Sequence, residues 1–228
     1  MKHKSLLMMM LLCFAFLGVA RAQQQELTVY PGTTTNNRIP AYILYFDDFA
    51  RSQYVIPADS LIEMTGGTIS GLRYYTSTNN TPYTTVSTVD VYIMEVDYTT
   101  ISAFEPKTNA TIVYQGLLNI EKLEDHGELY IQFSTPYQYS GGNLLIGVEN
   151  TTDAGYKGIN FYGQGGQTGA SISGSNGTSL DNVTPTQQNF IAKTTFTYTP
   201  GSGSNLSFHS CAIDKLKGYG LIFCPVDW

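Results

Sequence analysis

The chain has 228 residues, with 18 acidic against 12 basic side chains and a formal net charge of −6. An acidic chain without clustered Lys or Arg is untypical of proteins that bind nucleic acid or anionic membrane surfaces, so neither kind of partner is expected. The 17 Tyr, 11 Phe and 22 Gly are typical of an all-β protein, because aromatic residues favour strands and Gly weakens helices.

Residues 1–22 have the organisation of a secretory signal peptide. A basic start, KHK, precedes an apolar run over residues 5–19, and the small-x-small motif ARA ends the segment. The run is shorter than the roughly 20 apolar residues that a membrane-spanning helix needs. We therefore expect cleavage after Ala22, secretion or display at the cell surface, and no membrane span. A lipoprotein is the alternative because Cys13 lies in the run, although the preceding Leu12 is larger than lipidation requires.

Runs of strand-forming residues recur along the rest of the chain, with turn signals between them. Residues 58–64 break this pattern, because an acidic start and a Gly-Gly stop predict one or two helical turns there. Gly71 predicts a bulge within its strand. The expected strands cover residues 27–30, 41–46, 53–56, 68–77, 86–96, 110–115, 158–162 and 189–198.

The stretch 128–150 predicts two more strands, joined by a tight turn as in a hairpin. Apolar and polar residues alternate in ELYIQFS, which is the pattern of a strand with one buried face. Pro136 cannot donate to a ladder, so this strand is expected to stop there or to continue only at an edge. Gly141-Gly142 supplies the turn, and the apolar run 144–148 predicts a strand that is covered on both faces.

About ten strands with almost no helix predict an all-β fold, a two-sheet antiparallel β-sandwich of the jelly-roll type. An up-and-down barrel is the alternative. We assign this domain to residues 23–200 and expect residues 201–228 to form a flexible linker and a C-terminal tail. The tail holds Cys211 and Cys224, which either form a disulfide in the exported protein or remain two unpaired thiols.

Motifs for nucleophilic or nucleotide chemistry are absent from the sequence, which has no Gly-x-Ser-x-Gly elbow and no phosphate-binding loop. We therefore predict no catalytic residue. A glycoside hydrolase would need two carboxylates across a cleft. The candidate groups are Asp47 with Asp48, Asp90 with Glu95 and Asp97, and Glu149 with Asp153.

Acidic and amide side chains also gather at expected strand ends, where a structural calcium ion is a candidate because calcium takes oxygen ligands. The residues are Asp47, Asp48, Glu149, Asn150, Asp153 and Asp181. The alternative is that they are turn residues that cap backbone amides. We expect no other cofactor.

Several tyrosines border the expected loops and are the candidate ligand-binding residues, because an exposed ring stacks on a sugar or buries area against a protein at little entropic cost. They are Tyr74, Tyr75, Tyr83, Tyr137, Tyr139, Tyr156 and Tyr162. Packing in the core is the alternative role for each of them.

Four segments also carry a resemblance to a known family: residues 89–104, 111–116, 131–150 and 189–200. They are similar to secreted surface modules of the Bacteroidetes, relatives of the cleaved-adhesin domains of gingipain and haemagglutinin proteins. The similarity covers roughly residues 26–200 and is most specific in the motif PYQYSGGNLLI. It implies a jelly-roll domain, placement outside the cell, and adhesion to proteins or glycans without catalysis.

The sequence thus predicts a non-catalytic, adhesin-like extracellular module whose partner is a host or matrix protein or a partner module. The first alternative is a carbohydrate-binding module of a polysaccharide-utilisation system. The second is a glycoside hydrolase.

Overall fold

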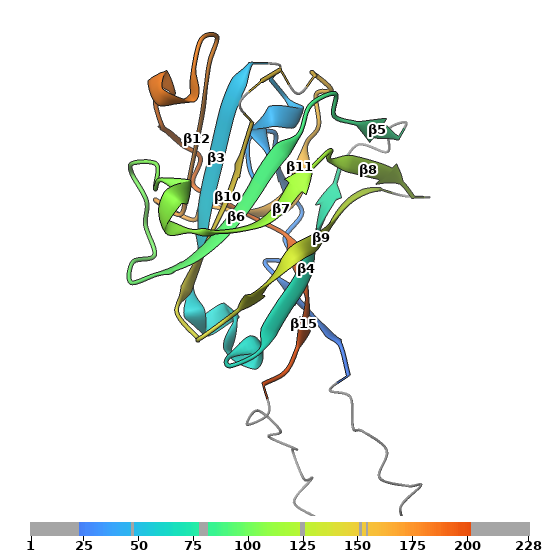
Figure 1. Cartoon of the computed structure of the whole chain (residues 1–228), viewed down its shortest axis with the longest axis vertical. Helices are drawn as coiled ribbons and strands as arrows, with labels where there is room; N and C mark the ends of the chain where they lie inside the picture. The colour runs from blue at the N-terminus through green and yellow to red at the C-terminus, as the bar shows by residue number, and fades with distance from the viewer. Residues whose placement is uncertain are drawn as a thin grey trace, which may run out of the picture.

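Two antiparallel sheets face each other across an apolar core in the computed structural model (Figure 1). The structure describes residues 23–46, 48–77, 82–123, 126–150, 152–153 and 155–201. The expected signal peptide, Asp47, the linker from residue 202 onward, Cys211 and Cys224 lie outside the described residues.

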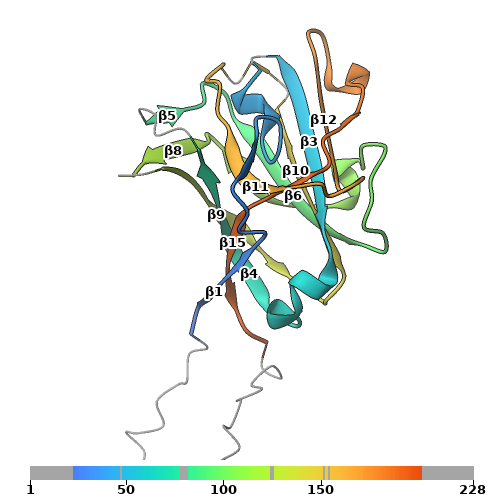
Figure 2. The ribbon, with the colours of Figure 1, turned by 180° about the vertical axis from the view of Figure 1, so that it is seen from behind.

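The larger sheet has nine strands and follows the order β1-β15-β4-β9-β8-β5, with β11 joining β4, β2 and β14. The first and last strands, β1 and β15, pair with each other at one end of the molecule (Figure 2). The nine strands are β1 (Gln25–Val29), β2 (Thr34–Asn36), β4 (Thr68–Thr76), β5 (Tyr83–Thr84), β8 (Asn119–Lys122), β9 (Gly127–Gln138), β11 (Phe161–Gly165), β14 (Phe190–Ala192) and β15 (Thr194–Thr199).

The smaller sheet has six strands in the order β13-β12-β3-β10-β6-β7. They are β3 (Phe49–Ile56), β6 (Val89–Val96), β7 (Thr111–Gly116), β10 (Asn143–Glu149), β12 (Ser171–Asn176) and β13 (Thr186–Gln187). Five single-turn 3₁₀ helices lie in the connections: η1 (Tyr42–Leu44), η2 (Ala58–Ser60), η3 (Ile62–Met64), η4 (Lys107–Asn109) and η5 (Leu180–Asn182).

The main core lies between the sheets and is built by the expected alternation. Leu129, Ile131 and Phe133 of β9 are buried in it, whereas Tyr130 of the same strand is exposed. Strand β10 is covered on both faces, as predicted, because Leu144 joins the main core and Leu145 joins a second cluster on the other side of its sheet. The predicted antiparallel sandwich is therefore confirmed.

The segment 128–150 is not a hairpin, and this prediction was wrong. Strand β9 pairs with β4 and β8 in the larger sheet, whereas β10 pairs with β3 and β6 in the smaller one. The turn between them is an arch that crosses the core. Because β3 and β4 cross in the same way, the two arches pair strand by strand, β3 with β10 and β4 with β9, as in a jelly roll.

Three local predictions can be compared directly with the structure. The helical turns over 58–64 are confirmed as η2 and η3. The bulge predicted at Gly71 lies one residue earlier, because Ser70 is the extra β4 residue in the pairing with β15. The strand predicted over 41–46 was wrong, because η1 occupies its middle. The three residues of η1 are buried. A short apolar run in the sequence fits a buried helical turn as well as a buried strand, so the sequence alone did not distinguish the two.

Candidate functional site

The outer face of the nine-stranded sheet carries tyrosine and charged side chains in place of apolar ones. In β4 the buried Tyr74 alternates with Tyr75, and in β9 the buried Leu129 alternates with Tyr130. Tyr162 of β11 follows the buried Phe161 in the same way. We name the outward side chains Tyr75, Glu128, Tyr130, Tyr162 and Lys193, together with their neighbours Arg73, His126 and Glu121, the tyrosine face.

One end of the tyrosine face is hollowed into a cavity of about 220 Å³, lined by Tyr75, His126, Tyr162 and Lys193. The ammonium group of Lys193 lies 4.1 Å from the centre of the Tyr75 ring, and the His126 ring lies 5.8 Å from it on a tilted plane. The Tyr75 hydroxyl is hydrogen-bonded to Thr195 Oγ1 at 2.8 Å. The ring is thereby fixed, and it holds the lysine charge in place by a cation–π contact.

Lys193 and Tyr162 are joined through the backbone, because the Lys193 amide donates to the Tyr162 carbonyl at 2.8 Å. Within the described ranges, no carboxylate forms an ion pair with Lys193. Its positive charge is therefore not neutralised by a neighbouring described carboxylate, and the cavity offers a ligand this cation beside the rings of Tyr75, Tyr162 and His126.

A second hollow, of about 240 Å³, lies further along the same face and is lined by residues that include Tyr114, Asn119, Glu121, Glu128 and Tyr130. The Tyr114 hydroxyl donates to the Leu117 carbonyl at 2.6 Å, which fixes the edge of this hollow. Tyr130 is 42% exposed, so much of its ring is accessible to a ligand.

Glu128 lines the second hollow and contacts His126 of the first. Its carboxylate contacts His126 Nε2 at 3.2 Å and Arg73 Nε at 3.4 Å, and Arg73 also reaches Glu26 at 3.4 Å. Burial lowers the pKa of Arg73, but Glu128, Glu26 and Tyr75 together more than offset this and raise it overall, so the guanidinium stays charged. These ion pairs link the charged side chains between the hollows.

The seven candidate tyrosines occupy four different environments. Tyr75 and Tyr162 lie together on the tyrosine face. Tyr74 and Tyr139 are fully buried and cannot touch an external ligand, so their prediction as binding residues is corrected to core packing. Tyr137 is half-buried and packs against the main core.

The remaining two candidates, Tyr83 and Tyr156, line neither of these two hollows. Lys157 Nζ lies 5.7 Å from the centre of the Tyr83 ring. Tyr156 is 61% exposed and meets Tyr45 edge to face, with 5.9 Å between ring centres. Tyr156 is therefore an exposed tyrosine outside the tyrosine face.

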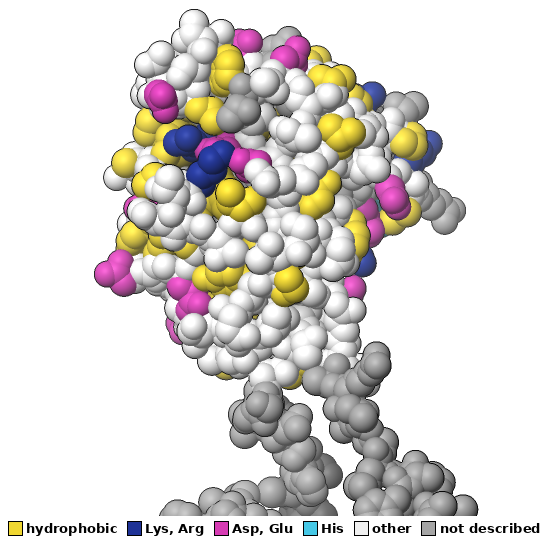
Figure 3. Space-filling model, in the orientation of Figure 1, with side chains coloured by type: hydrophobic (Ala, Val, Ile, Leu, Met, Phe, Trp, Pro, Cys, Tyr) yellow, Lys and Arg dark blue, Asp and Glu magenta, His cyan; other side chains and the backbone are white. Residues whose placement is uncertain are grey.

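The outer face of the six-stranded sheet differs from the tyrosine face, because it carries a cluster of ion pairs around the buried Glu149. Glu149 is 1% exposed, and its carboxylate contacts Arg51 Nε at 2.7 Å and Lys107 Nζ at 2.5 Å. Lys107 also contacts Asp90 at 2.5 Å. Basic and acidic side chains are seen side by side over this sheet in Figure 3. The charges neutralise one another, so this cluster fixes the segment around η4 to the sheet.

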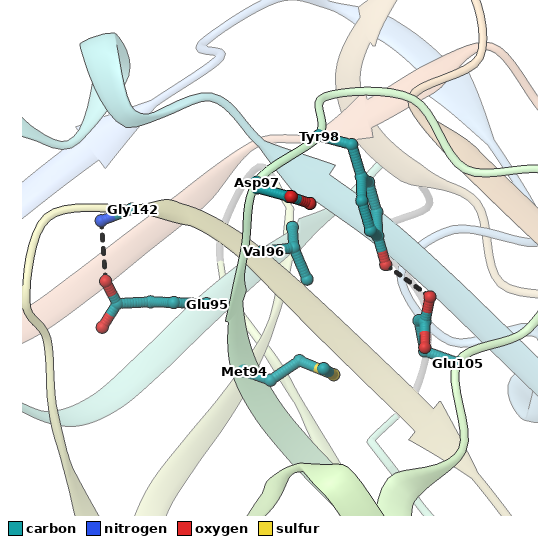
Figure 4. A pocket seen from close by; sticks show the side chains of 7 residues that line it. All are labelled: Met94, Glu95, Val96, Asp97, Tyr98, Glu105 and Gly142. Atoms are coloured by element: carbon teal, nitrogen blue, oxygen red, sulfur yellow. Dashed lines mark hydrogen bonds between the residues drawn. The ribbon is translucent and has the colours of Figure 1, made fainter.

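A wider hollow of about 640 Å³ lies beside the end of β6 and is lined by residues that include Glu95, Asp97, Tyr98 and Glu105 (Figure 4). Glu95 accepts hydrogen bonds from the Ser140 and Gly142 amides, both at 2.7 Å. Glu105 accepts from the Tyr98 hydroxyl at 2.7 Å. Of the three carboxylates that line this hollow, those of Glu95 and Glu105 thus accept hydrogen bonds from neighbouring groups of the protein.

The described members of the candidate calcium set do not converge on one site. Glu149 is occupied by Arg51 and Lys107, and the Asn150 side chain accepts from the Ala50 amide at 3.1 Å and donates to the Asp48 carbonyl at 3.1 Å. Asp153 accepts from the Gly155 amide at 2.7 Å, and Asp181 belongs to η5. Among the residues described, no group of three or more His, Cys, Asp or Glu could hold a metal ion. The turn-capping alternative fits Asn150 and Asp153.

No family is shown by comparison with known proteins. No family model matches the chain, and neither a curated protein nor a solved structure matches it. The resemblance to adhesin domains therefore stays a prediction from the sequence. In the described part of the chain, no helix is both long enough and apolar enough to cross a membrane.

Sequence reasoning missed Tyr130, His126 and Lys193 as members of the site. The alternation in β9 was visible and already placed Tyr130 on the face opposite the buried leucine. Lys193 and His126 had no such signal, because they reach Tyr75 only through the pairing of distant strands.

Proposed function

We propose that the chain is a non-catalytic, adhesin-like extracellular binding module that recognises a carbohydrate on its tyrosine face. The observation that carries this proposal is the pair of hollows in a polar sheet face, each bordered by tyrosine rings. Sugar rings combine apolar faces with hydroxyl groups, and such a surface offers both aromatic rings and charged or amide hydrogen-bonding groups.

The engagement of three carboxylates supports binding over hydrolysis, whereas Glu121, opposite Glu128 in the second hollow, forms no ion pair with another described side chain. Glu128 is held by Arg73 and His126, Glu149 is buried against two cations, and Glu95 accepts from two backbone amides. A hydrolytic pair needs one carboxyl group that is free to give up a proton and a second one that is free to act as base or nucleophile.

The polar character of the face favours a carbohydrate over a protein partner. Stable protein interfaces have a core of buried apolar and aromatic groups from which charged residues are depleted. The tyrosine face instead carries Glu128 and Lys193, two residue types that are depleted at protein interfaces, among its rings. Each hollow is small, and a volume near 220 Å³ holds about one sugar ring.

A glycan array tests the proposal with the full chain. We expect binding to one class of glycan, weakened about tenfold by Tyr162→Ala, because loss of a stacked ring costs about 1.4 kcal/mol. The matched control is Tyr156→Ala, which removes an exposed tyrosine outside the tyrosine face and should leave binding unchanged.

Three outcomes would contradict the proposal. They are binding to extracellular proteins with no glycan bound, equal losses in the two variants, and turnover of a polysaccharide by the purified chain. Circular dichroism of each variant checks that the fold is retained.

A further inference from the structure

The two hollows belong to one row of side chains that runs across the strands. The sheet register pairs Phe161 of β11 with Thr76 of β4, and the adjoining residues Tyr162 and Tyr75 line the first hollow together. Tyr75 is opposite Glu128 of β9, and Glu128 is opposite Glu121 of β8. All four side chains point outward. Neighbouring strands are about 4.8 Å apart, so a row over four strands spans about 14 Å.

The row has a ring-bearing hollow at each end and the ion-paired Glu128 between them. Tyr162 and Tyr75 line the first hollow, and Tyr130 lines the second. Glu128 belongs to the lining of the second and contacts His126 of the first at 3.2 Å. Each pair of neighbouring strands in the row is directly hydrogen-bonded, so no further strand lies between the hollows.

We propose that the tyrosine face binds an extended oligosaccharide that lies across the strands and occupies both hollows at once. This inference rests on the proposed function and adds to it the length and direction of the ligand. A single sugar ring fills one hollow only, since the row is several strand spacings long. A chain of linked sugars reaches both.

The ends of the row differ in charge, which gives the bound chain a direction. Lys193 provides a cation at the first hollow, whereas Glu121 lines the second. An ammonium group donates hydrogen bonds to ring oxygens, hydroxyls or a uronic carboxylate, whereas a carboxylate accepts them from hydroxyl or N–H groups and repels a uronic carboxylate. The first hollow is therefore the one that accepts an acidic sugar unit.

The test is a titration of the full chain with size series, from mono- to hexasaccharide, derived from cellulose, xylan, mannan and galacturonan. The variants are Tyr162→Ala in the first hollow, Tyr130→Ala in the second, and Tyr156→Ala as the control. We expect affinity to rise at least tenfold from the shortest to the longest member of the series that binds. Each of the two face variants should weaken hexasaccharide binding about tenfold, whereas Tyr130→Ala should leave the shortest ligand unaffected.

The outcomes separate this inference from the proposed function. Affinity that is independent of chain length, or hexasaccharide binding that depends on Tyr162 but not on Tyr130, overturns the two-hollow inference and leaves the proposed function standing. Binding that neither face variant changes overturns both. A thermal melt of each variant identifies any loss that comes from unfolding.

Discussion

At the scale of single residues, a glycine in one strand leaves the space that an aromatic ring of the next strand fills. Gly147 of β10 lies directly opposite Tyr92 of β6, and the Tyr92 ring lies over it. The Tyr92 hydroxyl accepts a hydrogen bond from Gln53 Nε2 at 2.8 Å. The hydroxyl is thus held by Gln53, while the ring packs over Gly147. A side chain at position 147 would have to displace this ring.

Gly147→Ala should therefore destabilise the protein. A Cβ atom at this position would lie 2.2 Å from Tyr92 ring carbons, which no relaxed contact allows. Overpacking of this kind costs about 1–3 kcal/mol in the free energy of unfolding, measured by urea denaturation. The matched control is Gly177→Ala, whose Cβ would meet its nearest neighbour, Asp48 Oδ2, at 3.5 Å and should cost less than about 0.5 kcal/mol. Equal stability of the two variants would contradict this account of Tyr92.

At the scale of elements, the arch between β9 and β10 places these two consecutive strands in different sheets. Tyr139 lies in the arch, and its amide donates to the Gly67 carbonyl at 3.0 Å while its carbonyl accepts from the Gly66 amide at 3.0 Å. Its hydroxyl donates to the Gly142 carbonyl at 2.7 Å. Gly141 has a φ of +116°, a conformation that suits glycine and few other residues. The buried tyrosine thus ties the arch to the turn before β4.

Gly141→Ala should destabilise the arch. The positive φ strains any L-residue, and the added Cβ would lie 3.0 Å from Thr65 Cγ2. The expected loss is about 1–3 kcal/mol in the free energy of unfolding. Ser140→Ala is the control from the same arch, because its backbone amide still donates to Glu95. Thermal denaturation of both variants makes the comparison, and an unchanged melting temperature for Gly141→Ala would contradict the role of this glycine.

The sequence predicted the strands better than their partners. Alternation and turn residues located β4, β6 and β10, because these depend on neighbours in the chain. The arch after Gln138 has the same Gly-Gly signal as a hairpin, and only the core contacts of Tyr139 distinguish the two. Likewise Tyr75 was a reasonable candidate from its sequence, but the contact with Lys193 depends on which strands lie side by side.

At the scale of the whole molecule, the two outer faces have different roles. The six-stranded sheet carries a second apolar cluster on its outer face, in which Ile101 and Phe104 of the β6–β7 connection cover Leu145. The ion pairs of Glu149 fix the same connection. The nine-stranded sheet has no such cover over the described tyrosine face. This asymmetry is the reason for placing the ligand there.

The fold should lose stability in alkali. Burial raises the pKa of Tyr54, Tyr74 and Tyr92 above the ordinary value of 10.0. Burial alone would lower the pKa of Lys107, but hydrogen bonds to Asp90 and Glu149 raise it overall above 10.5. Above about pH 10 the unfolded chain therefore holds fewer protons than the folded one, so stability falls as pH rises.

Urea denaturation at a series of pH values from neutral to strongly alkaline measures this loss. We expect a free energy of unfolding that is nearly flat around neutrality and decreases steadily above about pH 10. Ultraviolet titration should show some tyrosines ionising only as the fold is lost. Stability that rises in alkali, or ionisation of every tyrosine at its ordinary pKa in the folded protein, would be the contrary result.

The most direct test of the central claim is to map the bound ligand by NMR, following backbone amide shifts as the best oligosaccharide is added to labelled protein. We predict that the largest changes cluster at Tyr75, Glu128, Tyr130, Tyr162 and Lys193, across β4, β9 and β11. The largest changes at Glu95, Asp97 and Glu105, beside the wider hollow on the other sheet, would contradict it.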